Sequence, residues 1–193
     1  MFNWLNFLSY ALATAFTPGP NNIMSMSNAA RVGVKKFWPF NFGIWTGCFA
    51  LMLLCTVFCS TLSTLVPKIE LPMKIIGAAY LLWLAWKIFR SSGEIEEKQF
   101  KTGYFSGVAL QFMNPKLYLY GIFSVQIYIL PAYQDNWPML IAFAFLLSVI
   151  SFISTVSWAL FGSVFKLLFS KYARVTNTIM ALLLVYCAVA LFL

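Results

Sequence analysis

Two short polar stretches interrupt long uncharged runs of the chain, and they hold the residues whose types and spacing could do chemistry. The first is Thr17-Pro18-Gly19-Pro20-Asn21-Asn22. The second is Asn114-Pro115-Lys116, with Gln111 one helical turn before it. Proline has no N–H group, so the backbone carbonyl four residues earlier loses its helical partner. Both stretches therefore predict a break in a helix.

Each break also predicts a new helix start. Thr17 or Gly19 before a proline, and Asn114 before Pro115, read as a cap followed by proline at the first helical position. The N-terminal end of a helix carries partial positive charge, and Lys116 adds a full positive charge. Such a centre suits a carboxylate group.

The carbonyls that the prolines free supply the opposite polarity. They belong to Thr14, Phe16 and Gln111, and they could accept hydrogen bonds from an ammonium group. A small zwitterion would use both polarities, so we predict a binding site for one. The predicted site consists of Thr17, Pro18, Gly19, Pro20, Asn21, Asn22, Gln111, Asn114, Pro115 and Lys116.

Lys116 has two interpretations. A charge placed deep in a membrane is usually functional, which favours contact with substrate. The alternative is a structural lysine that satisfies the freed carbonyls of the break. Polar residues also recur near helical spacing through the first break, which favours a wet path over hydrogen bonding between helices. They are Asn3, Asn6, Tyr10, Thr14, Thr17, Asn21, Ser25 and Asn28.

The composition of the chain indicates whether these breaks lie in a soluble protein or in a membrane protein. The chain is 62% hydrophobic and 9% charged, whereas soluble domains are about 25% charged. We therefore expect residence in a lipid bilayer. The net charge of +8 lies in short clusters between apolar runs, which argues against a nucleic-acid partner. The chain has no histidine, which excludes imidazole metal sites and histidine bases, and no metal or cofactor is expected.

Six nearly uncharged segments predict an all-α integral membrane protein with six transmembrane helices. A span needs about 20 apolar residues. The third segment meets this length only if Lys74 and Lys87 extend to opposite surfaces. The segments are 3–30, 37–66, 71–90, 103–131, 137–165 and 175–193.

Clusters of lysine and arginine follow the first, third and fifth segments. The positive-inside rule places these turns in the cytoplasm and both termini on the periplasmic side. The hydrophilic stretch 91–102 then divides one transmembrane domain, 1–193, into halves at about 1–90 and 103–193. Three spans per half predict a 3+3 inverted repeat, with helices 1 and 4 broken near the midplane.

Small residues mark expected helix contacts. Gly43 and Gly47, and Gly103 and Gly107, form two GxxxG motifs that allow close approach of helix backbones. Ser148, Ser151 and Thr155 form a small polar row that either lines a pathway or packs against another helix. Cysteines 48, 55, 59 and 187 all lie in apolar runs, so we expect buried thiols rather than disulfides.

The two breaks, Thr17-Pro18-Gly19-Pro20-Asn21-Asn22 and Asn114-Pro115-Lys116, resemble those of the LysE-type family of amino-acid exporters. The resemblance covers the whole chain. The stretches 77–88 (GAAYLLWLAWKI) and 109–112 (ALQF) are similar to the cysteine and O-acetylserine exporter branch. The resemblance implies export of a small amino acid from the bacterial inner membrane, driven by protons, by a protein that can form a homodimer.

One departure concerns the proton carrier. Many members of this family have an acidic residue directly after the second glycine of the span-two motif, where this chain has Cys48. Lys116 is the remaining candidate, because no Asp, Glu or His lies within a predicted span. The alternatives are an exporter of homoserine, threonine or another amino acid, an intramembrane enzyme, and an interaction subunit. An enzyme would have no visible base, and an interaction subunit would have no use for a lysine at the midplane.

Overall fold

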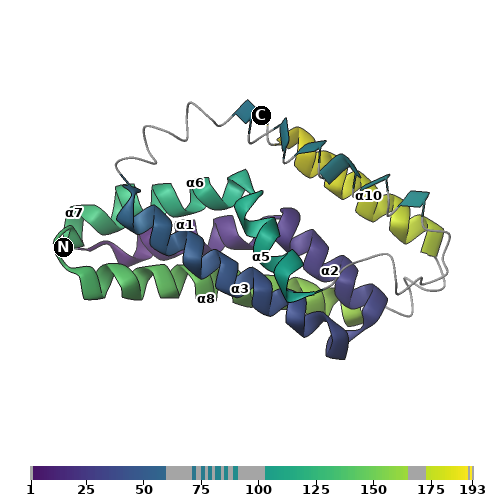
Figure 1. Ribbon diagram of the computed structural model, residues 1–193, viewed down its shortest axis with the longest axis horizontal. Helices are drawn as coiled ribbons and strands as arrows, with labels where there is room; N and C mark the ends of the chain where they lie inside the picture. The colour runs from purple at the N-terminus through teal and green to yellow at the C-terminus, as the bar shows by residue number, and fades with distance from the viewer. Residues whose placement is uncertain are drawn as a thin grey trace.

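The structure is a computed structural model that describes residues 2–59, 103–164, 173–190 and 192, and short pieces between 71 and 90. These pieces are 71–72, 75–76, 78–79, 81–83, 85–86 and 89–90. Regular secondary structure in the described residues is entirely helical (Figure 1). The predicted linker 91–102 lies outside the described residues. An all-helical membrane fold is what the sequence predicts.

The helices follow one another in a simple order. They are α1 (Trp4–Phe16), α2 (Pro20–Val32), α3 (Val34–Val57), α5 (Tyr104–Phe112), α6 (Pro115–Phe123), the π-helix η1 (Ser124–Ile129), α7 (Leu130–Tyr133), α8 (Trp137–Val164) and α10 (Ala173–Ala190). In Figure 1 the N-terminus lies beside α7 at one end of the bundle, and α2 meets α3 at the other end. Helix α10 lies along one side of the bundle.

The first hydrophobic segment forms two helices. Helix α1 begins after Asn3, whose side chain accepts a hydrogen bond from the backbone N–H of Asn6 at 3.1 Å. Helix α1 ends at Phe16, and α2 begins at Pro20 with Gly19 as its extended N-cap residue. At the other end of α2, Gly33 has φ 82°, a conformation that suits glycine, and α3 starts directly after it.

The fourth segment is interrupted in the same way. Helix α5 ends at Phe112, and α6 begins at Pro115 with Asn114 as its N-cap residue. Helix α6 continues into η1, where the N–H of Leu130 donates to the carbonyl of Val125, five residues earlier. We did not expect this π-helix, because no residue type in its sequence distinguishes it from an α-helix.

Within the described residues, two helices are long and apolar enough to cross a bilayer. They are the part of α3 from Lys36 to Val57, with 22 residues, and all of α8, with 28 residues. A span needs about 20 residues. Helix α10 has 18 residues and is also apolar in its centre. Length and composition thus agree with a membrane span for two of the six predicted segments.

Glycines bring helix backbones into contact at two crossings. A Cβ atom on Gly43 of α3 would lie 1.9 Å from the backbone oxygen of Tyr104, and one on Gly107 of α5 would lie 2.2 Å from that of Phe40. The α3–α5 crossing therefore has no space for a side chain. At the α2–α8 crossing, a Cβ on Gly162 would lie 2.3 Å from the oxygen of Met26. The predicted role of the GxxxG motifs in packing is confirmed for these α3 and α5 glycines.

Apolar clusters join the helices on both sides of the two breaks. The first is built from α1, α3, α6, η1 and α8, with Phe7, Leu51 and Leu147 fully buried. The second includes Ala78, Leu81 and Ala85 from the third predicted segment, together with residues of α2 and α10. The described pieces of the third segment lie beside α10 and share this apolar cluster with α2 (Figure 1).

A cluster of aromatic rings closes the end of the bundle that holds the N-terminus. Its members are Phe2, Trp4, Phe7, Tyr133 and Phe143, from the N-terminal end of α1, from α7 and from α8. Their ring centroids lie between 4.8 Å (Phe2–Trp4) and 5.6 Å (Phe2–Tyr133) apart for the pairs that include Phe2. We call this group the aromatic cluster.

The four cysteines are buried and free of disulfides. Cys48, Cys55 and Cys59 belong to the first apolar cluster, and Cys187 belongs to the second. The prediction that they act as small buried side chains at helix contacts is confirmed.

Candidate functional site

The two chain breaks meet in the middle of the structure. The Asn21 amide donates to the Gln111 side-chain oxygen at 2.7 Å, and the Gln111 amide returns a hydrogen bond to Asn21 Oδ1 at 3.2 Å. The Asn114 amide also donates to Asn21 Oδ1, at 3.3 Å. All three side chains are buried. Residues about half a chain apart therefore form one hydrogen-bonded group.

Lys116 joins the two breaks a second time. Its Nζ donates to the backbone carbonyl of Thr17 at 2.8 Å. The side chain runs across Gly19, where an added Cβ would lie 3.1 Å from Nζ and 3.2 Å from Cδ. The contact with Thr17 is the one that the structural interpretation of Lys116 requires. A carboxylate could also reach the same ammonium group, because Lys116 lines a cavity.

Side chains of α2 and α8 satisfy the carbonyls of the first break. The carbonyl of Ala15 accepts from Asn22 Nδ2 at 2.8 Å and from Ser154 Oγ at 2.9 Å. The indole N–H of Trp158 donates to the carbonyl of Phe16 at 3.3 Å. Backbone carbonyls exposed in an apolar medium are costly, so these bonds allow the chain to leave helical geometry here.

The backbone carbonyls that bind side-chain donors are in part different from the predicted ones. We expected free carbonyls at Thr14, Phe16 and Gln111. The structure places side-chain donors on Ala15, Phe16 and Thr17, because the chain is already unwound when it reaches Pro18. The carbonyl of Gln111 accepts the backbone N–H of Asn114 at 3.2 Å, which closes a tight turn before Pro115.

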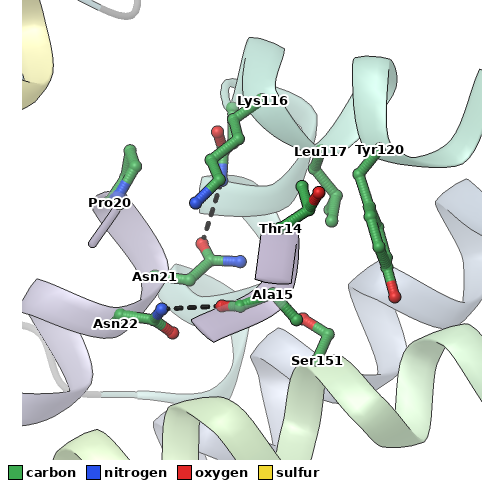
Figure 2. Close-up of a pocket in the computed structure, with 11 residues that line it drawn as sticks. Thr14, Ala15, Pro20, Asn21, Asn22, Lys116, Leu117, Tyr120 and Ser151 are labelled. Atoms are coloured by element: carbon green, nitrogen blue, oxygen red, sulfur yellow. Dashed lines mark hydrogen bonds between the residues drawn. The ribbon is translucent and has the colours of Figure 1, made fainter. Parts of the chain in front are cut away.

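A cavity of about 340 Å³ lies between the breaks (Figure 2). This volume includes space that is open to solvent, and the enclosed part is about 30 Å³. The cavity is formed by the end of α1, the first turns of α2 and α6, and the middle of α8. Its lining residues are Thr14, Ala15, Gly19, Pro20, Asn21, Asn22, Asn114, Lys116, Leu117, Tyr120 and Ser151.

The cavity offers both hydrogen-bond donors and acceptors. The backbone N–H groups in the first turn of a helix have no partner within the helix, and the first turn of α2 lines the cavity. Lys116 adds a cationic donor. On the acceptor side, Asn114 is 4% exposed and its Oδ1 has no hydrogen-bond partner. A buried acceptor without a partner costs free energy, which a bound donor would recover.

The structure brings most of the predicted site together. Gly19, Pro20, Asn21, Asn22, Asn114 and Lys116 line the cavity. Thr17 contributes its carbonyl, and Gln111 holds Asn21 from behind. Pro115 is buried as the first residue of α6. Pro18 is exposed and does not line the cavity.

Sequence reasoning did not assign Thr14, Ala15, Leu117, Tyr120 or Ser151 to the site. Signals existed for two of them. Thr14 belongs to the polar residues that recur through the first break, and Ser151 belongs to the small polar row of α8. Ser148 and Thr155 from that row are buried and donate to carbonyls of their own helix. One member of the row, Ser151, therefore lines the cavity, and the other two belong to the helix packing.

Polar side chains continue from the cavity along α2. Ser25 Oγ donates to Asn41 Oδ1 of α3 at 2.9 Å, and both residues are fully buried. Asn28, one turn further, is also buried. The part of the predicted polar face that lies on α2 is therefore buried in the bundle, whereas Asn3, Asn6 and Thr17 are exposed.

The arrangement suits binding rather than catalysis. Among the residues that line the cavity, Lys116 is the one charged group, and neither a carboxylate nor an imidazole accompanies it. No group of three or more metal-ligating side chains occurs in the described part of the chain. The lining residues can therefore recognise a charged ligand, but they do not include the paired nucleophile and base that catalysis would need.

Comparison with known proteins agrees with this interpretation. A family model described as "LysE type translocator" matches residues 12–193. The chain is 42% identical over 188 residues to the cysteine/O-acetylserine efflux protein of Salmonella typhimurium strain LT2, covering 96% of this chain and 95% of the relative. It is 39% identical to the protein of the same name from Escherichia coli strain K12, with the same coverage. No solved structure matches. The chain is a membrane translocator rather than an enzyme, and it belongs to the LysE type translocator family.

Proposed function

We propose that the protein is a secondary transporter of the bacterial inner membrane that exports small neutral amino acids, above all cysteine and O-acetylserine. The relatives that are 39–42% identical to it carry the names of efflux proteins for these two compounds. The observation that carries the proposal is the cavity itself. Two helices that begin with proline direct their N-termini toward one small cavity, and Lys116 lies beside them.

In the proposed complex the substrate carboxylate binds between Lys116 Nζ and the first turn of α2. A carboxylate is a stronger acceptor than a neutral carbonyl, so it would replace Thr17 as the partner of Lys116. The substrate ammonium group donates to Asn114 Oδ1, the buried acceptor that has no other partner. Both charges of the zwitterion then have a partner of opposite polarity.

The proposed architecture is a multi-pass protein of six spans in a 3+3 inverted repeat with both termini in the periplasm. Helices α1 and α2 together would form span one, and α5, α6, η1 and α7 would form span four. Each of these spans is interrupted at a proline, and the two interruptions contact each other. The distribution of basic clusters supports the orientation.

We also propose coupling to the proton gradient, with Lys116 as the group that changes its protonation. Lys116 is the one charged side chain that lines the cavity, which supports this assignment. Replacement with methionine would remove the proton site. Full efflux by Lys116→Met when driven by a pH gradient would contradict this role.

Uptake of radiolabelled amino acids into inside-out membrane vesicles tests the transport function. The panel contains cysteine, O-acetylserine, homoserine, threonine and lysine. We expect uptake of cysteine and O-acetylserine by the wild type, and a loss of about tenfold or more in Lys116→Met and Asn114→Ala. Gln134→Ala, an exposed change in the turn before α8, serves as the control.

Two outcomes would overturn parts of the proposal. Unchanged transport in both Lys116→Met and Asn114→Ala would remove the cavity as the substrate site. Uptake of homoserine or threonine without uptake of cysteine or O-acetylserine would transfer the assignment to that substrate class.

A further inference from the structure

The cavity has two unlike ends (Figure 2). Lys116, Pro20 and Asn21 surround one end. Tyr120 lies away from Pro20, and Ser151 projects from α8 below Ala15. The charged end provides the groups that hold a carboxylate and an ammonium. The other end presents the Tyr120 ring and the Ser151 hydroxyl, and it has no charged side chain.

Three helices build this second end. Tyr120 of α6 is 3% exposed, its hydroxyl donates to the carbonyl of Leu147 at 3.4 Å, and its ring stacks on Tyr10 with centroids 6.3 Å apart. Ser151 of α8 is 7% exposed and lines the cavity beside Tyr120. Cys48 of α3 is fully buried and belongs to the same apolar cluster as Tyr120. Tyr120 and Ser151 therefore form the wall of this end, and Cys48 lies in the packing behind it.

We propose that Tyr120 and Ser151, with Cys48 behind them, form the subsite for the side chain of the transported amino acid and limit its length. This inference depends on the proposed transport function. Once Lys116 and Asn114 hold the carboxylate and the ammonium, the substituent on the α-carbon has to extend toward the remaining end of the cavity. That end is closed by the wall.

The chemistry of the wall matches short, neutral and weakly polar substituents. The Ser151 hydroxyl can donate to a thiol sulfur or to an ester carbonyl, and the Tyr120 ring packs against an apolar methyl group. No charged side chain is present in the wall. A carboxylate or ammonium on the substrate side chain would lose its water without gaining a partner, which is costly. The subsite therefore selects against acidic and basic amino acids.

The two proposed substrates differ in length, which makes the subsite testable. O-acetylserine carries an acetyl group where cysteine carries only sulfur. Ser151→Val adds volume to the wall, so we expect uptake of O-acetylserine to fall by about tenfold or more relative to cysteine. Ser151→Ala leaves the volume nearly unchanged but removes the hydroxyl that can donate to the ester carbonyl, a stronger acceptor than a thiol sulfur. The ratio should therefore also move against O-acetylserine, by about threefold or more.

The matched control is Ser148→Val, one turn earlier on the same helix. Ser148 is fully buried and donates to the carbonyl of Phe145, but it does not line the cavity. Both substrates are added to the same inside-out vesicles with different labels. The uptake ratio is then independent of how much folded protein each variant yields.

The ratio also separates this inference from the transport function. A wild type that takes up neither substrate would contradict the transport function. A wild type that takes up both, with a ratio unchanged within about twofold in Ser151→Val and Ser151→Ala, would overturn the subsite alone. A shift in Ser148→Val as large as that in Ser151→Val would also overturn it, because the effect would then belong to the packing of α8. Should Ser151→Val fail to accumulate in the membrane, Ser151→Ala still decides the question.

Discussion

Lys116 crosses from α6 to the carbonyl of Thr17, and Gly19 leaves the space for it. A cation at this depth needs an acceptor in the absence of substrate, and the carbonyl provides one. The structural and the functional interpretations of Lys116 are therefore compatible. The same lysine stabilises the unwound segment when the cavity is empty and, in the proposed complex, would exchange the Thr17 carbonyl for the substrate carboxylate.

Gly19→Ala tests this use of space. The backbone of Gly19 is extended, with φ −163°, so alanine can adopt it. The new Cβ would lie 3.1 Å from Lys116 Nζ, which has to move by a few tenths of an ångström. We expect transport to fall about tenfold, while the melting temperature in detergent changes little. A large loss of melting temperature with transport per folded molecule unchanged would contradict this expectation.

Asn22 and Ser154 stabilise the first break without being charged. Asn22 donates to the carbonyls of both Ala15 and Thr17, and Ser154 donates to that of Ala15. We expect Asn22→Ala to lower the free energy of unfolding by about 0.5–1.5 kcal/mol, because the carbonyls of Ala15 and Thr17 each lose one of two donors. The measurement is thermal unfolding in detergent, with the exposed Asn6→Ala as the control. Equal stability of the two variants would show that the carbonyls find other donors.

The sequence predicted the local chemistry of the breaks better than their partners. Proline at the first helical position, with Gly19 and Asn114 as N-cap residues, is confirmed. Local spacing suffices for that prediction. Ser154 and Trp158 could not be assigned to the carbonyls of Ala15 and Phe16, because the donor and acceptor are about 140 positions apart in the chain. Only the packing of α8 against α1 and α2 brings them together.

At the scale of helices, the close crossing of α3 and α5 depends on two glycines. Gly43 and Gly107 face each other, with backbone atoms of the opposite helix nearest to each missing side chain. Two GxxxG motifs were recognisable from sequence, and their pairing with each other was not. Gly103 of the second motif has no atom within 4 Å of its Cβ position, so it takes no part in the crossing.

This difference supplies a matched pair of variants. Gly43→Ala places a methyl group against a backbone oxygen, which cannot rotate away, so we expect a loss of about 1–3 kcal/mol in stability. Gly103→Ala should be close to neutral. Thermal unfolding in detergent and the amount of protein in the membrane measure both. Equal effects of the two changes would contradict the crossing.

At the scale of the whole molecule, hydropathy predicted the membrane fold but not all of its helices. The uncharged run 103–131 contains α5, α6, η1 and α7, because one window of apolar residues does not separate proline-started and π-helical pieces. The third segment has described residues that lie beside α10 and share an apolar cluster with α2, as a third span of six would require. Its charges, Lys74 and Lys87, lie outside the described residues.

Cysteine labelling tests the proposed orientation. Gly103→Cys lies at the predicted cytoplasmic end of span four, and Gln134→Cys lies in the exposed turn after it. The four native cysteines are buried, so their background reaction is low. In cells with a permeable outer membrane, an impermeant maleimide should label Gln134→Cys, and Gly103→Cys only after the inner membrane is opened. The reverse pattern would invert the topology.

The π-helix η1 allows a change of register after α6 that a regular α-helix does not allow. A π-helix contains about one residue more per turn than an α-helix. If η1 changed to α-helical geometry, the segment after it would advance along the helix axis by about 1.5 Å and rotate by about 100°. Tyr128, whose ring lies 5.6 Å from that of Tyr10, and Tyr133, which belongs to the aromatic cluster, would both leave their present neighbours. Lys116 lies before η1 and would keep its place. A register change of one residue would thus separate the rings of the aromatic cluster while Lys116 keeps its contact with Thr17.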